Sequence, residues 1–143
     1  MKVSEIMTRE VETVTPDTTL QEAAKLMARV DAGALPILEN DRLSGIITDR
    51  DIAVRAVGEG RDPNTTKVRD IMSGQVKHVA EDDNVEEVAD LMAELQVRRL
   101  PVVNRERRVV GIVSLGDIAR EKKPHTAGEA LQGISRPGGQ HNS

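Results

Sequence analysis

One internal repeat constrains the fold of this 143-residue chain more than any other feature. Three stretches return in the same order 65 or 66 positions later: Val3–Thr8 as Val68–Ser73, Leu35–Leu38 as Leu100–Val103, and Gly45–Ala53 as Gly111–Ala119. Each pair keeps its residue classes as well as its spacing, and chance does not preserve both over so long a stretch. The chain is therefore predicted to hold two copies of one structural unit.

Both copies predict the order strand, helix, strand, strand, helix, so the expected fold class is α/β in the broad sense that includes α+β. The expected short first strands are Val11–Thr15 and Val76–Ala80. The first helix of each copy is expected to begin at a capping box, Thr18-x-x-Gln21 or Asp83-x-x-Glu86. The helix of the first copy is expected to bury one face, formed by Leu20, Ala23, Ala24 and Met27. The Leu-Pro runs and the runs led by Gly45 and Val109 predict a hairpin in each copy, and second helices are expected over 49–57 and 115–122.

Glycine and proline residues indicate the expected domain boundaries. Repeat 1 is predicted over 1–60, a Gly- and Pro-containing linker over 61–67, and repeat 2 over 68–123. The remaining residues, 124–143, hold four Gly and two Pro, and we expect a disordered tail with one short helix near 127–131.

Composition excludes several function classes. The chain has no Cys and no aromatic residue, and its net charge is -4. Disulfides, Cys-ligated metals and Cys nucleophiles are therefore excluded, and nucleic-acid binding is disfavoured because stacking rings and a basic surface are absent. No metal site is expected, because the three histidines, His78, His125 and His141, are not spaced as metal ligands. The sequence contains no nucleophile–base pair and no P-loop, so no enzyme activity is expected. Without a signal peptide or a membrane-length apolar run, the expected location is the cytoplasm.

The paired units closely resemble a tandem CBS-domain pair, also called a Bateman module. The resemblance rests on the two Ile-Met-(Thr/Ser) openings, the two Leu-Pro strands and the two Gly-led segments, and it covers residues 1 to about 122. Three further segments are similar to stand-alone bacterial CBS proteins of the hypoxic-response and stress type: Thr48–Ile52, Asp62–Thr65 and Gln96–Pro101.

The resemblance implies two repeats related by a pseudo-twofold axis and packed through their sheets. It implies a regulatory sensor that binds AMP, ADP, ATP or a related adenosine compound in clefts between the repeats and acts on an unknown partner protein, with no cofactor required. It also implies a homodimer, and Leu26, Met27, Leu91 and Met92 are candidates for its interface or for the core. The alternative is a non-catalytic interaction protein whose clefts are vestigial.

Each repeat has one segment suited to a nucleotide, Thr48-x-x-Asp51 and Ser114-x-x-Asp117. A hydroxyl at a helix N-terminus can donate to phosphate, and a carboxylate one turn later can accept from ribose hydroxyls. The same pattern also describes a plain helix cap, and that interpretation stays open for both segments.

The two candidate sites differ in charge. In similar modules a basic pair before the second strand reaches ligand phosphate; repeat 2 has Arg98 and Arg99 there, whereas repeat 1 has Gly33 and Ala34. Family geometry implies that the Ser114–Asp117 cleft also includes residues 8–12 and Ala32. It implies that the Thr48–Asp51 cleft also includes residues 73–77 and Val97, where Arg50 and Lys77 would supply positive charge.

The basic pair favours the Ser114–Asp117 cleft as the tighter nucleotide site. The alternative for Arg98 and Arg99 is a solvated pair or a salt bridge across a dimer interface. Gly116 stands where the family often has a second hydroxyl, which removes one expected ligand contact.

Overall fold

The computed structural model describes residues 1–72, 77–121 and 124–135, and these fall into two compact units. Unit 1 joins residues 1–10 to the chain from residue 77 onward, and unit 2 comprises residues 11–76. Each unit therefore combines the body of one repeat with the opening segment of the other. The predicted boundary at residue 60 follows the sequence repeat, but it does not follow the compact units.

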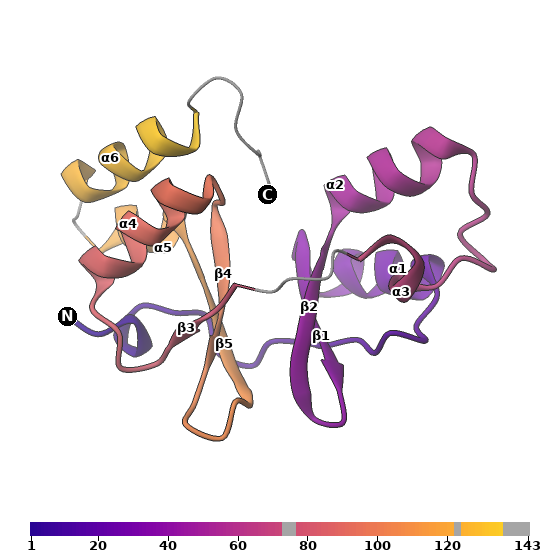
Figure 1. Cartoon of the computed structure of the whole chain (residues 1–143), viewed down its shortest axis with the longest axis horizontal. Coiled ribbons are helices and arrows are strands. Elements are labelled where there is room, and N and C mark those ends of the chain that lie inside the picture. Colours follow the sequence, from indigo (N-terminus) through magenta and orange to yellow (C-terminus); the bar gives the residue numbers. More distant parts are fainter. Residues whose placement is uncertain (73–76, 122–123, 136–143) are drawn as a thin grey trace. The chain divides into compact units, whose positions relative to one another are not determined.

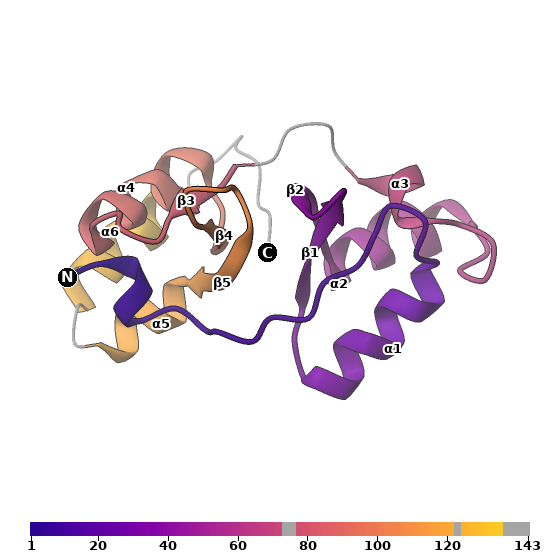
Figure 2. The same cartoon turned by 90° about the horizontal axis from the view of Figure 1, so that it is seen from below.

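Unit 1 has a three-stranded sheet with helices gathered on one of its faces (Figures 1 and 2). The sheet order is β3-β4-β5, with β3 parallel and β5 antiparallel to β4. The strands are β3 (Val79–Ala80), β4 (Arg99–Val103) and β5 (Val109–Ser114). The helices are the 3₁₀ turn η1 (Val3–Glu5) and the α-helices α4 (Val85–Leu95), α5 (Leu115–Arg120) and α6 (Pro124–Ile134).

Unit 2 has an antiparallel pair, β1 (Ala34–Glu39) and β2 (Arg42–Thr48). Its helices are α1 (Leu20–Val30), α2 (Asp49–Asp51) and α3 (Val68–Ile71), and α2 continues through a π-helical turn, η2 (Ile52–Ala56), and a 3₁₀ turn, η3 (Val57–Glu59). Gly60 ends this helical run with φ of 72°, in the left-handed region that glycine adopts at little cost. The strand-helix-hairpin-helix order predicted for each repeat is thus present in reduced form.

Backbone hydrogen bonds explain why the N-terminal segment belongs to unit 1. The N–H of Val3 donates to the carbonyl of Asp83 at 2.8 Å, and the N–H of Ser4 donates to that of Glu81 at 3.1 Å. The Val3 side chain is fully buried, which contributes about 1.5–3 kcal/mol. The segment is therefore an integral part of the unit that holds repeat 2.

The same contacts recur in unit 2 at positions 65 residues later. Val68 donates to Thr18 at 2.8 Å and Arg69 donates to Pro16 at 3.0 Å, and the Val68 side chain is also fully buried. The opening Ile-Met segments of the two repeats thus pack in the same way, each against the body of the other repeat.

Surface ion pairs lie beside both opening segments, which we call the exchanged segments because each packs against the body of the other repeat. In unit 1 the Lys2 ammonium lies 3.4 Å from the Asp82 carboxylate. In unit 2 the equivalent Lys67 lies 3.7 Å from Asp17, and Arg69 contacts the same Asp17 oxygen. The hydrogen bond and charge of Arg69 lower the pKa of Asp17 below its ordinary value of 3.8.

Each unit has its own aliphatic core. The core of unit 1 includes Val3, Ile6 and Met7 from the opening segment together with Met92, Leu100, Val102, Val113 and Ile118. The core of unit 2 includes Val68 and Ile71 together with Leu20, Met27, Leu35, Ile37 and Ile47. Met27 and Met92 are therefore core residues, and Ala24, which was expected to be buried, is exposed.

Several predicted boundaries shift. The expected strand over 11–15 is a single parallel bridge between Val14 and Ile37, and β3 has two residues, with residue 76 outside the described chain. The helix caps are Thr19 and Asn84, one residue after the predicted ones. Thr18 is instead used to close the preceding turn, because its hydroxyl accepts from the N–H of Thr15.

The predicted disordered tail is wrong for residues 124–134, which form α6. This helix packs on α4, where Ala130 and Ile134 are buried and the Gln96 side-chain amide donates to the Gly133 carbonyl at 2.8 Å. A Cβ on Gly133 would lie 2.5 Å from Cβ of Ala93, so glycine permits the close approach of the two helices. The predicted short helix near 127–131 lies within α6, and its full length was underestimated because glycine and proline usually indicate irregular chain.

Candidate functional site

A strand-to-helix turn in each unit carries the predicted hydroxyl and carboxylate. Thr48 ends β2 and caps α2: its hydroxyl accepts from the Asp51 N–H at 3.1 Å, and the Asp51 carboxylate accepts from the Thr48 N–H at 3.0 Å. Ser114 and Asp117 make the same reciprocal pair at 3.1 and 2.8 Å in unit 1. The helix-cap interpretation is therefore correct as geometry at both turns, and it leaves open what the remaining carboxylate oxygens do.

The two carboxylates differ in their second oxygen. Within residues 1–72, 77–121 and 124–135, Oδ1 of Asp51 accepts no hydrogen bond, and Asp51 is half-buried. Oδ1 of Asp117 instead accepts from the guanidinium of Arg120, and Asp117 is only 4% exposed. The turn in unit 2 thus offers an uncommitted acceptor, whereas the turn in unit 1 does not.

Arg120 is a residue of this turn that the sequence analysis did not identify. It lies one helical turn after Asp117, a spacing at which an acidic and a basic side chain meet on a helix, so the pair could have been predicted. The equivalent residue of repeat 1 is Val54, which cannot pair with Asp51. A Cβ on Gly116 would lie 3.7 Å from Nη1 of Arg120, which places the guanidinium over the first turn of α5.

In unit 2 the segment before β1 also lies at the turn. The Asp49 N–H donates to the Gly33 carbonyl at 3.0 Å, and Ala34 pairs with Thr48 across the hairpin. Ala32 is held just before, with its N–H donating to the Met27 carbonyl at 3.0 Å. The structure therefore brings together the predicted residues Ala32, Gly33, Thr48 and Asp51.

Unit 1 repeats the arrangement with charged residues. The Leu115 N–H donates to the Arg98 carbonyl at 2.8 Å, and Arg99 pairs with Ser114 across the hairpin. Val97 directly precedes them, and its N–H donates to the Met92 carbonyl at 3.0 Å. Val97, Arg98, Arg99, Ser114 and Asp117 are therefore neighbours, although family geometry assigned Val97 to the Thr48–Asp51 cleft.

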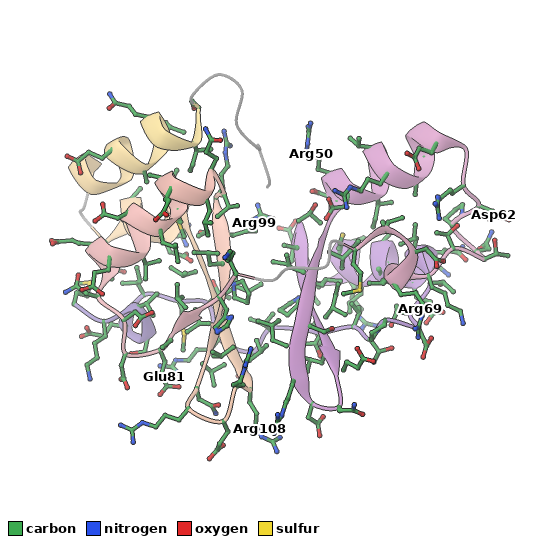
Figure 3. The ribbon with its side chains drawn as sticks, in the orientation of Figure 1. Arg50, Asp62, Arg69, Glu81, Arg99 and Arg108 are labelled. Carbon is green, nitrogen blue, oxygen red and sulfur yellow. The ribbon has the colours of Figure 1, made fainter. Side chains whose placement is uncertain are left out.

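The predicted cations lie at the starts of these elements. Figure 3 shows Arg50 in the first turn of α2 and Arg99 at the start of β4. Arg50 and Arg98 are exposed and Arg99 is half-buried, and the described part of the chain gives none of them an ion-pair partner. All three guanidinium groups thus remain able to bind an anion.

Two predicted groupings join residues of different units. Lys77 is exposed and, like Val97, belongs to unit 1, whereas Thr48 and Asp51 belong to unit 2. In the other grouping, Ala32 belongs to unit 2, whereas Ser114 and Asp117 belong to unit 1. Both clefts stay predictions, as does the packing of the repeats through their sheets, and residues 73–76 lie outside the described residues.

Neither a metal site nor a membrane-spanning helix is found in the described residues. Among the residues that the structure describes, no three His, Asp or Glu side chains gather closely enough to hold a metal ion. No helix in the same residues has the length and apolar character needed to cross a membrane.

Comparison with known proteins gives matches over nearly the whole chain. The CBS domain model matches twice, at residues 3–58 and 68–123. The CBS domain-containing protein YhcV of Bacillus subtilis (strain 168) is 43% identical over 134 residues, which cover 93% of this chain and 94% of YhcV.

Two solved structures are similar to this chain in fold as well as in sequence. A crystal structure of Hypoxic Response Protein I with two coordinated zinc ions gives a TM-score of 0.77 at 40% identity, covering 84% of this chain and 98% of that one. The CBS domain pair of protein MJ0100, in complex with 5′-methylthioadenosine and S-adenosyl-L-methionine, gives a TM-score of 0.77 at 33% identity, covering 87% and 98%.

Proposed function

This chain belongs to the CBS domain family and carries two CBS domains, and on that premise we propose that it is a non-catalytic regulatory module that binds an adenosine-containing small molecule. The observation that carries the proposal is the uncommitted Oδ1 of Asp51, beside a buried Thr48, in a chain similar to a CBS pair that holds two adenosine compounds. The module would act by changing its contacts with a partner protein when the ligand binds.

The chemistry of the unit 2 turn suits a ribose. A carboxylate only accepts hydrogen bonds, and the vicinal hydroxyls of ribose are two donors placed close together. Asp51 keeps its reciprocal cap through Oδ2 and has Oδ1 available for a hydroxyl. Arg50 is the cation at this turn, since Gly33 and Ala34 stand where unit 1 has Arg98 and Arg99, so we propose that the unit 2 turn favours adenosine ligands without phosphate, such as 5′-methylthioadenosine.

The unit 1 turn suits a phosphorylated ligand. Arg98 and Arg99 lie beside Ser114 and can form charge-assisted hydrogen bonds to phosphate, which favours AMP, ADP or ATP there. The prediction that this is the tighter nucleotide site stands as a proposal for phosphorylated ligands.

A homodimer remains part of the proposal, with a narrower set of candidate residues. Met27 and Met92 are 7% and 0% exposed in their own cores and are withdrawn as interface residues. Leu26 and Leu91 are half-buried on α1 and α4 and remain candidates. Light scattering at micromolar concentration should give twice the chain mass of 15.6 kDa.

The second candidate function is an interaction protein with vestigial ligand sites. The observation that favours it is the closed unit 1 turn, where both oxygens of Asp117 already have protein partners. Such a protein would bind its partner without a small molecule.

Thermal unfolding with a panel of ligands separates the two functions. The panel holds adenosine, 5′-methylthioadenosine, S-adenosylmethionine, AMP, ADP, ATP and NAD. A ligand present at 100 times its Kd adds about 2.7 kcal/mol to the free energy of unfolding, which is easily detected. Stabilisation by an adenosine compound that Asp51→Ala or Asp117→Ala weakens supports the regulatory module. If no member of the panel stabilises the protein at millimolar concentration, the interaction protein is the better account.

A further inference from the structure

The ion pair between Arg120 and Asp117 has no counterpart in the other unit. Arg120 contacts Oδ1 of Asp117, while Oδ2 is used by the N–H of Ser114. At the equivalent place in unit 2 stands Val54, whose side chain is 54% exposed and carries no donor. One repeat therefore has a cation over its carboxylate and the other has none.

The two ends of this ion pair are in different surroundings. Asp117 is 4% exposed, whereas the Arg120 side chain is 71% exposed. The guanidinium is therefore largely solvated and can leave the carboxylate by a change of side-chain rotamer, without unfolding α5. Because the guanidinium keeps most of its solvation in either position, Arg120 can act as a movable partner of the buried carboxylate.

We infer that Arg120 is a specificity-determining residue that makes the unit 1 turn select adenosine ligands carrying phosphate over those without it. This inference rests on the proposed ligand-binding function. A phosphate-free ligand must displace Arg120 from Asp117 and leaves the guanidinium with water alone. A phosphorylated ligand offers the displaced guanidinium a new anion, with which arginine forms paired charge-assisted hydrogen bonds.

The neighbouring residues fit this role. Gly116 has no side chain between Ser114 and Arg120, so the guanidinium lies directly over the start of α5. Arg99 pairs with Ser114 on the adjoining strand, so a second cation lies next to the same turn. Arg120 therefore adds to a cationic turn when phosphate is present, and it blocks the carboxylate when phosphate is absent.

The test uses calorimetry on the full chain carrying Asp51→Ala, so that the unit 1 turn is measured with the other carboxylate removed. Adenosine and ATP are titrated into this variant and into the same variant with Arg120→Val, which copies Val54. We expect Arg120→Val to tighten adenosine binding by up to about fivefold and to leave ATP binding unchanged or weaker. Arg120→Lys, which keeps the charge, should retain most of the preference for ATP.

The reciprocal variant is the matched control. Val54→Arg, made in a chain carrying Asp117→Ala, should weaken adenosine binding at the unit 2 turn by a similar factor. Since residues 54 and 120 are both exposed, the melting temperature should change little in either case.

The outcomes separate this inference from the function on which it rests. If the unmodified chain binds neither adenosine nor ATP, the proposed function fails and the inference falls with it. If the chain binds both, but Arg120→Val leaves the ratio of the two affinities unchanged, the function stands and the role of Arg120 is wrong.

Discussion

The turn after β2 and the turn after β5 have the same backbone and nearly the same cap, yet they present different carboxylates. Asp51 keeps one oxygen uncommitted, whereas Asp117 is buried and has Arg120 on its second oxygen. A repeat thus preserves the local structure, while one residue a helical turn away changes which carboxylate oxygen is available. Equivalent sequence patterns therefore need not offer equivalent hydrogen-bond acceptors.

The largest expected effect tests how the exchanged segment packs within each unit. Gly45 and Gly111 are equivalent strand residues that face the exchanged methionines. A Cβ on Gly111 would lie 2.7 Å from Sδ of Met7 and 2.7 Å from the carbonyl oxygen of Thr8, and that backbone atom cannot move aside. Gly111→Ala should therefore lower the free energy of unfolding by about 3 kcal/mol in urea titration.

Gly45→Ala is the control for that substitution. Its Cβ would meet the flexible ends of Met72 and Ile37 at 2.9 and 3.0 Å, which can shift, so the loss should be about 1 kcal/mol. Equal losses at the two glycines would contradict the difference between a backbone contact at Gly111 and side-chain contacts at Gly45.

A smaller effect concerns phosphate. Arg99 lies beside the unit 1 turn, where unit 2 has the uncharged Ala34. Arg99→Ala should weaken ATP binding about tenfold, since a hydrogen bond to a charged group contributes about 1.5–3 kcal/mol. Adenosine has no phosphate and should lose little. Calorimetry that finds equal losses for both ligands would place Arg99 away from the phosphate.

A third prediction concerns α6, the helix of unit 1 that packs on α4. Gly133→Leu would collide with Ala93, whereas Gly128→Leu enters open space. The first substitution should lower the free energy of unfolding by about 1–2 kcal/mol, limited because α6 can detach, and the second should leave it unchanged or slightly raised. Hydrogen exchange of the α6 amides distinguishes detachment from global loss, and equal behaviour of the two variants would rule out the close helix crossing.

The smallest expected effect concerns pH. Arg69 holds the pKa of Asp17 below its ordinary value of 3.8, so the native state binds this proton less readily than the unfolded chain does. The stabilisation is therefore present well above the unfolded pKa of 3.8 and is lost as pH falls through the lowered native pKa. Melting curves of the parent and of Asp17→Asn should differ slightly at pH 6 and converge as the pH falls through and below that native pKa, and a difference that grows toward acid would have the wrong sign.

Much of the fold could be predicted because the repeat carries it. The hairpins, both main helices of each repeat and the capped turns follow from residue pattern, and residues 48, 51, 114 and 117 lie where that pattern places them. The exchange of the opening segments could not be predicted from pattern, because Val3 and Val68 have the same local sequence whichever body they pack against. Long-range burial decides that choice.

The length of α6 and the Arg120–Asp117 contact could not be predicted from the repeat. In α6, glycines that lower helix propensity are offset by tertiary packing against α4, so the helix extends beyond the predicted 127–131. Arg120 has no counterpart in repeat 1, where the equivalent residue is Val54, so matching positions do not indicate its contact with Asp117.

The most direct test of the contrast between the two turns is calorimetry of 5′-methylthioadenosine with the parent chain, Asp51→Ala and Asp117→Ala. Because the ribose acceptor is assigned to Asp51, Asp51→Ala should lower the affinity at least about tenfold, the loss expected for a hydrogen bond to a charged group. Asp117→Ala should change it by less than about twofold, within the range of a weak or absent contact. If Asp117→Ala abolishes binding while Asp51→Ala has no effect, the assignment of the two turns is reversed and the account is wrong.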